Sequence, residues 1–353
     1  IWIENRKNIA PTFSTIMMKE FFNVFVQESL VLIEDLEEIA LNGNEIICFD
    51  YLYRCTIQIT CDIWRYRFRN IYIIPDIIFN LTSLGKKQRE CINISHSIVE
   101  KMIQQRTNEL STMSTNGDIS HKRFVDIFMR LFSDEKFTQK EIIDNVVTMI
   151  GAAADTTAAT LNFVIFMLAN FSEIQEKAYK ELLEIYGTET PKNAPVKYED
   201  LQHMNYLDCV IKETLRLFPS IPMIGRILTE DLKIGEFVIP KGTDVIISII
   251  RMHRNEKYWP NPLMFDPDRF LSEKTNCLPY YFMPFSDGSR NCIGAKYAMM
   301  SMKVILATLI RMFVFKLNHS IEIDKIKLNS DIVLSTVEPL KIKIEKRNLF
   351  YSK

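Results

Sequence analysis

The sequence predicts a mainly α-helical fold that also contains small β-sheets. Apolar residues recur at helical spacing over most of the chain, whereas the patterns typical of strands are short and occur late. Only 10 Gly and 13 Pro accompany 23 Phe and 16 Met, which favours densely packed helices over a loop-rich fold. With 353 residues, 47% of them hydrophobic, the chain is long enough to bury a large core.

Six segments are expected to be helical because their apolar residues share one face of a 3.6-residue period. In chain order they are residues 12–40, 87–105, 139–170, 173–186, 205–218 and 293–314. Strand signals occur at 232–249, where Pro240 to Gly242 predict a turn between two apolar runs, and at 332–344, which Pro339 interrupts.

Two turn-rich stretches, 187–198 and 254–271, are expected to be surface connections. The second combines Trp259 with several Pro and Phe residues, so we expect it to pack as a rigid strap. Since no repeat or charged linker divides the chain, we expect residues 1–353 to form a single domain.

Charge and cysteine usage narrow the class of protein. The net charge of -1 argues against a nucleic-acid binder, which needs an excess of Lys and Arg. The seven Cys are odd in number and include no C-x-x-C pair. This indicates a reducing compartment and argues against a zinc knuckle.

The nearest candidate for a membrane span, 297–315, contains Lys303 and Arg311 and is better interpreted as a core helix. Because the chain starts at Ile1, we expect a fragment whose membrane anchor preceded it.

The residues from Phe285 to Gly294 form the most distinctive loop of the chain. Cys292 lies directly before a predicted helix, between two glycines and two residues after Arg290. Amide groups at a helix start lower the pKa of a cysteine, and the flanking Gly288 and Gly294 let the backbone approach a flat partner. Arg290 would neutralise an acidic group of that partner. Alternatively, Cys292 is a buried small hydrophobe. These residues alone leave open whether it is a thiolate ligand or a nucleophile.

Two further motifs are ambiguous when taken singly. Glu213 and Arg216 stand three residues apart on a predicted helix, a spacing that most often gives a weak surface ion pair. Their neighbours are apolar, so we expect a buried pair that needs additional partners. Trp2 and Arg6 share one helix face, where a bidentate Arg suits a carboxylate.

The residues from Ala152 to Thr157 lie midway along the predicted helix 139–170. Asp155 and the paired Thr residues are poor helix formers, so something other than propensity explains them. A turn inside an interrupted helix is the weaker explanation, because the apolar pattern continues on both sides.

These motifs, in this order, resemble those of the cytochrome P-450 haem-thiolate monooxygenases, and most closely the insect family-four clan. The loop order F-x-x-G-x-R-x-C-x-G resembles the haem-binding loop of that family. The resemblance implies the P-450 fold, with 1–353 as one catalytic domain that lacks the N-terminal anchor, the first helices and part of the main sheet. It implies haem b as cofactor, with Cys292 as the axial ligand of the iron.

The resemblance also implies roles for the other motif residues. Asp155 and Thr156 would relay protons during oxygen activation, the Thr156 hydroxyl disturbing the helix to make a groove. Glu213, Arg216 and Arg269 would form a structural network behind the haem loop. The remaining residues would contact the haem or its propionates: Phe285, Gly288, Arg290, Gly294, Trp2, Arg6 and Arg226.

Two positions depart from the family pattern. Ala153 replaces the usual Gly and slightly crowds the groove. Ala152 stands where family-four members often carry a Glu that can esterify haem, so no covalent haem link is expected.

The implied activity is insertion of one oxygen atom of O2 into a lipophilic substrate: a fatty acid, a hormone-like lipid or a xenobiotic. Because the chain has no G-x-G-x-x-G fingerprint, electrons should come from NADPH through a separate NADPH-cytochrome reductase, possibly aided by a cytochrome b-type donor. The implied location is the cytosolic face of the endoplasmic reticulum. The alternatives are a haem-thiolate isomerase or dehydratase, and an inactive fragment or helical binding protein that keeps the haem loop.

Overall fold

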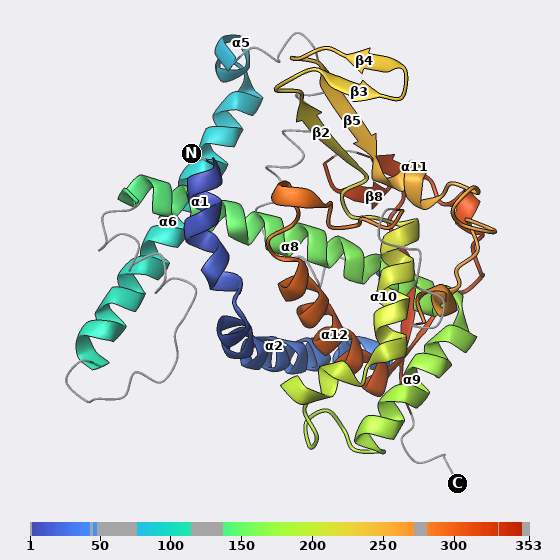
Figure 1. Ribbon diagram of the computed structural model, residues 1–353. Coiled ribbons are helices and arrows are strands. Elements are labelled where there is room, and N and C mark those ends of the chain that lie inside the picture. The colour runs from blue at the N-terminus through green and yellow to red at the C-terminus, as the bar shows by residue number, and fades with distance from the viewer. Residues whose placement is uncertain are drawn as a thin grey trace.

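The computed structural model describes residues 2–42, 45–47, 76–113, 137–271, 281–330 and 332–347. In this part of the chain, long helices form most of the structure, and the strands belong to small antiparallel sheets (Figure 1). The predicted fold class, mainly α with small β-sheets, is confirmed.

All six predicted segments are helical, five of them with ends within a few residues of the prediction, while the helix predicted at 87–105 extends eight residues beyond its predicted end, to Met113. The long helices are α1 (Trp2–Ile9), α2 (Thr15–Asn42), α6 (Ser83–Met113), α8 (Gln139–Asn170), α9 (Ser172–Tyr186), α10 (Asn205–Leu217) and α12 (Ala295–Met312). Two shorter helices are α5 (Asp76–Leu81) and α11 (Ile249–His253). Helix α8 begins with a capping box, in which the side chains of Thr138 and Glu141 each accept the other residue's backbone N–H.

Helix α8 runs across the middle of the molecule and organises the core (Figure 1). It contacts α6, α9, α10, α12 and strand β6 (Phe313–Lys316). Its length and apolar composition would allow it to cross a membrane, but 61% of its apolar window is buried inside the protein. Its second half, from Ala158 to Ala169, is almost wholly buried and belongs to the main hydrophobic cluster from Leu161 onward, so α8 is a core helix.

The predicted strand segment 232–249 supplies three strands, which form two nested hairpins together with a fourth strand that precedes it. Strand β2 (Met223–Ile227) pairs with β5 (Asp244–Ser248), and the tighter β3 (Leu232–Ile234) pairs with β4 (Phe237–Ile239). The predicted turn at Pro240 to Gly242 exists, but the two runs that it joins do not pair with each other. The reason is a second turn at Gly235, whose φ of 59° lets β4 fold back on β3 first.

The C-terminal strands form two small antiparallel sheets. Strand β9 (Lys341–Lys346) lies between β1 (Ile46–Ile47) and β6, and β7 (Leu328–Ser330) pairs with β8 (Leu334–Thr336). Buried residues of β6, β8 and β9 join the same cluster as α2, α8, α10 and α12. These helices and the C-terminal strands therefore share one core, whereas buried residues of α1, α6 and the start of α8 form a second, smaller cluster.

Candidate active site

An apolar cavity of about 410 Å³ opens beside the middle of α8. Its other walls come from the start of α12, the loop before α12 and the segment after α10. Residues that line it include Ala153, Thr156, Phe285, Cys292 and Tyr297. The fold thus brings two motifs that are far apart in sequence, the Ala152–Thr157 segment and the Cys292 loop, to one cavity.

Backbone hydrogen bonds hold Cys292 at the cavity wall. Its N–H donates to the carbonyl of Phe285 at 2.8 Å, which closes the loop between the two residues. The Gly294 N–H lies close to the sulfur and favours its thiolate form. A Cβ added to Gly294 would lie 4.0 Å from the Cys292 sulfur and 3.9 Å from the Phe13 ring, so the glycine leaves space beside the sulfur.

The pKa of Cys292 differs from the expectation. The sequence predicted a lowered pKa at the helix start, but desolvation raises the pKa of this thiol above its ordinary value. The Gly294 amide and the Arg6 charge oppose that effect without overcoming it. Helix α12 begins only at Ala295, three residues beyond the sulfur, so the helix dipole acts from a distance.

The predicted loop residues differ in exposure, and Cys292 itself is partly open to solvent. Phe285 is half-buried and lines the cavity, whereas Gly288 and Arg290 are exposed in a short 3-10 turn. Gly288 has a φ of 77°, a left-handed conformation that explains a glycine there.

Helix α1 brings Arg6 to the Cys292 loop itself. Its guanidinium donates to the carbonyl oxygen of Asn291 at 2.7 Å and to the Oδ1 of Asn291 at 2.6 Å. The sequence had linked Arg6 only to a propionate, so this contact with the residue beside Cys292 is new. Trp2 is the first residue of the same helix, and its side chain lies outside the described part of the structure.

The Ala152–Thr157 segment does not interrupt α8. The Thr156 hydroxyl donates to the Ala152 carbonyl at 2.7 Å, and the α-helix continues on both sides. Thr156 and Thr157 line the cavity, but Asp155, which is half-buried, is not in its described lining. The Thr157 hydroxyl oxygen is buried and has no hydrogen-bond partner among the described residues. The expected disturbance of the helix is therefore limited to the Thr156 hydroxyl, which donates a side-chain hydrogen bond to the Ala152 carbonyl.

Arg226 stands on β2, on the same face as the cavity-lining Ile224 because side chains alternate along a strand. Its Nη1 donates to the neighbouring Gly225 carbonyl at 2.7 Å.

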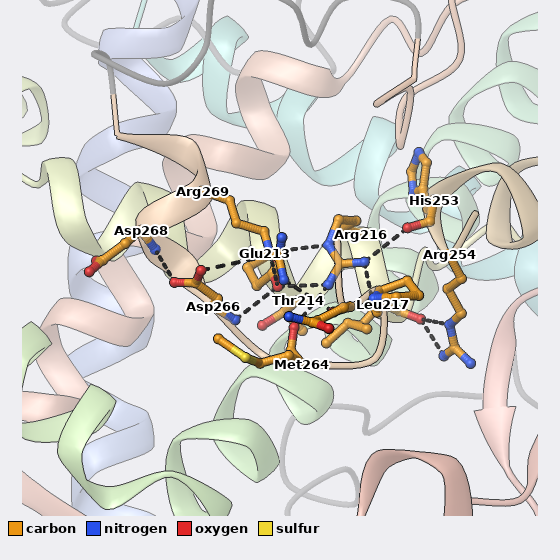
Figure 2. A network of polar contacts seen from close by, with 12 residues as sticks. Glu213, Thr214, Arg216, Leu217, His253, Arg254, Met264, Asp266, Asp268 and Arg269 are labelled. Atoms are coloured by element: carbon orange, nitrogen blue, oxygen red, sulfur yellow. Dashed lines mark hydrogen bonds and ion pairs between the residues drawn. The ribbon is translucent and has the colours of Figure 1, made fainter. Parts of the chain in front are cut away.

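Glu213 and Arg216 are completely buried and form a bidentate pair at 2.7 Å (Figure 2). The remaining Arg216 donors bind three carbonyls, that of His253 at the end of α11 and those of Pro262 and Met264 in the strap. The guanidinium also lies over the Trp259 ring, 5.1 Å from its centroid.

Arg269 joins this network less tightly. Its Nε lies 3.5 Å from Glu213, and its Nη2 donates to the Asn261 carbonyl at 3.1 Å. The backbone N–H of Asp266 donates to the Glu213 carboxylate at 2.9 Å. The network therefore ties α10 to the strap, and it does not line the cavity.

Sequence reasoning missed several residues at or near the cavity. Phe13 and Tyr297 line it and pack edge to face, with ring centroids 6.4 Å apart. Ser220 and Ile221 line it from the turn after α10. In the sequence these four carry no signal beyond an apolar or turn-forming residue. His253 is also completely buried, and the sequence assigns it no role.

The described residues fit a haem group. An iron porphyrin brings four nitrogen ligands of its own, so a single protein side chain, such as a cysteine thiolate, would hold it. The cavity offers one thiol, that of Cys292, in a mostly apolar wall, and no three His, Cys, Asp or Glu gather as a metal site in the described part of the chain. Cys292 would hold the iron, and Gly294 leaves room beside the sulfur.

Comparisons with known proteins agree with this geometry. A family model described as Cytochrome P-450 matches residues 64–344. The chain is 32% identical to cytochrome P-450 4c21 of Blattella germanica, over 98% of this chain and 75% of that relative. It is 31% identical to cytochrome P-450 4V2 of Mus musculus, over 98% and 72% of the two chains, and 31% identical to cytochrome P-450 4d1 of Drosophila melanogaster, over 98% and 75%. The chain thus belongs to the cytochrome P-450 family of haem-thiolate monooxygenases.

Proposed function

We propose that this monooxygenase oxidises a lipophilic substrate, such as a fatty acid, a hormone-like lipid or a xenobiotic, within the cavity beside α8. The observation that carries the proposal is that Cys292 and Thr156 line the same apolar cavity. Its described lining contains no Asp, Glu, Lys or Arg, which suits a substrate whose reacting part is uncharged.

Each proposed residue has a separate task. Cys292 would hold the haem iron through its thiolate, with Phe285 beside it in the cavity wall. When bound there, haem supplies oxygen activation, and the thiolate favours cleavage of the O–O bond. Thr156 would hold a proton at its hydroxyl on the cavity side, and Asp155, the residue before it on α8, would exchange protons with solvent. Arg6, Arg226, Arg290 and Trp2 surround the site and are proposed to hold the propionates.

We further propose that the electrons come from NADPH through a separate NADPH-cytochrome reductase, or from a cytochrome b-type donor. Lys7, Arg290 and Lys296 are exposed on α1, on the Cys292 loop and at the start of α12. Their charge suits an acidic partner that docks behind the thiolate. We place the protein at the cytosolic face of the endoplasmic reticulum membrane, in line with the resemblance to family four.

The decisive test is the reduced, carbon-monoxide-bound difference spectrum of the expressed chain. A strongly red-shifted haem band is expected, and Cys292→Ser should abolish it. Cys91→Ser is the matched control, because Cys91 is a buried cysteine on α6 that does not line the cavity. Loss of the band in both variants, or in neither, would contradict the assignment of Cys292.

The same spectrum separates the alternatives. Folded protein without any haem signal would favour a non-catalytic helical protein that keeps the loop. A red-shifted band without oxidation of any lipophilic substrate, in the presence of reductase and NADPH, would favour a haem-thiolate isomerase or dehydratase.

A further inference from the structure

His253 is a completely buried imidazole that belongs to neither motif of the cavity. It ends α11, and its ring is stacked on Phe282, with centroids 5.3 Å apart and planes inclined by 30°. Its Nε2 lies 3.0 Å from the backbone nitrogen of Met283 and accepts that N–H. A nitrogen that accepts a backbone N–H carries no proton, so the neutral ring must hold its proton on Nδ1.

The contact with Met283 leads directly to the Cys292 loop. The Met283 carbonyl accepts the Ser286 N–H at 3.0 Å, which closes a turn in which Ser286 has a φ of 60°. The carbonyl of Phe285, inside this turn, accepts the Cys292 N–H at 2.8 Å. Three successive hydrogen bonds therefore connect the imidazole to the backbone of Cys292.

On its other side, His253 belongs to the Arg216 network. Its carbonyl accepts from the Arg216 guanidinium at 2.9 Å, as Figure 2 shows. The carbonyls of Leu215 and Arg216 lie near the ring, although Nδ1 completes no hydrogen bond with the described residues. The residue thus joins the rigid α10 network to the loop that carries the thiol.

Packing alone does not explain an imidazole at this position. A Phe or Leu would fill a buried, aromatic-rich volume without burying polar nitrogens. An imidazole with one incomplete hydrogen bond is costly, so its acceptor nitrogen is the feature that an apolar residue could not supply.

We propose that His253 is a positioning residue for the Cys292 ligand: its Nε2 fixes the backbone at Met283 and, through the turn at Phe285, the direction in which the Cys292 sulfur faces the haem. This inference rests on the proposed function, since the sulfur is the iron ligand there.

The test uses the full chain, expressed with haem. His253→Phe keeps the aromatic volume and the stack on Phe282 but removes the acceptor, and His253→Gln restores an acceptor at a similar reach. We expect His253→Phe to bind haem and to shift the ratio of red-shifted to unshifted carbon-monoxide complex by about five- to tenfold, the effect of one buried hydrogen bond. His253→Gln should recover most of the red-shifted band. An unchanged ratio in His253→Phe would overturn the proposal, and so would equal loss in both variants.

A second measurement uses the wild-type chain, so it does not depend on whether a variant folds. The nitrogen-15 NMR spectrum of the histidine rings in the wild-type chain, which has 5 His, should show one ring with a bare Nε2 and a protonated Nδ1. The Met283 amide should be strongly protected from hydrogen exchange. A ring protonated on Nε2, or a fast-exchanging Met283 amide, would refute the contact. If the wild-type chain gave no red-shifted band, the proposed function would fail, whereas these two observations would still decide the role of His253 in the loop.

Discussion

Replacing Arg216 with Met should lower the free energy of unfolding by about 3–5 kcal/mol, because it leaves a carboxylate unpaired in the interior. The Arg216 side chain is completely buried and donates twice to Glu213 and once each to the carbonyls of His253, Pro262 and Met264. After the replacement, Glu213 keeps only the Asp266 N–H at 2.9 Å and the more distant Arg269 at 3.5 Å.

The size of the effect has two sources. The larger is the buried carboxylate, and the smaller is the loss of a donor for the carbonyls of His253, Pro262 and Met264. Replacing Glu213 by Leu together with Arg216→Met removes the buried charge, so the double variant should be more stable than Arg216→Met alone. The difference between them measures the cost of the unpaired carboxylate.

Urea unfolding, followed by far-ultraviolet circular dichroism and by tryptophan fluorescence, measures these changes, since Trp259 lies against the Arg216 guanidinium. Lys316→Met is the matched control, because the Lys316–Glu345 pair is half-exposed and its loss should cost about 0–1 kcal/mol. If Arg216→Met cost no more than this control, the argument that the buried pair holds the strap would be wrong.

Three other predictions address the site and the fold. Thr156→Ala should keep haem binding but lower coupled product formation on the order of a hundredfold, because electrons are diverted to peroxide. The measurement is the amount of product and of peroxide formed per NADPH. Full coupled turnover in this variant would exclude the proton-transfer role of Thr156. Desolvation lowers the pKa of His253 from 6.5 to about 4, so its contribution to stability is complete above pH 6.5 and is lost as the pH falls towards 4, by roughly 3 kcal/mol. Urea midpoints measured across that range should fall less steeply for His253→Phe, and an equal slope would contradict the burial of a neutral ring. Thr138→Ala should cost about 1 kcal/mol in thermal or urea unfolding by removing the α8 cap, whereas the exposed mid-helix Thr148→Ala should cost almost nothing.

Local pattern was sufficient for the helices and for the identity of the loop residues. Helical periodicity depends on residues three and four apart, so α8, α10 and α12 could be located without tertiary information. Strand pairing depends on distant partners, which is why the turn at Pro240 was predicted while the pairing of β2 with β5 was not.

The surroundings of the thiol depended on contacts between distant segments. Arg6 contacts Asn291, which is 285 residues away in the chain, and His253 contacts Met283, which is 30 residues away. No sequence motif indicates either contact. The predicted direction of the Cys292 pKa shift was wrong for the same reason. Desolvation by the surrounding fold raises this pKa by more than the Gly294 amide and the Arg6 charge lower it.

The sequence by itself determined the fold class, the order of the motifs and the candidate iron ligand, because these follow from residue type and short-range spacing. Only the tertiary structure decided which side chains surround that ligand. Burial, desolvation and the pairing of buried polar groups arise when segments far apart in the chain exclude water together, and no local pattern encodes that.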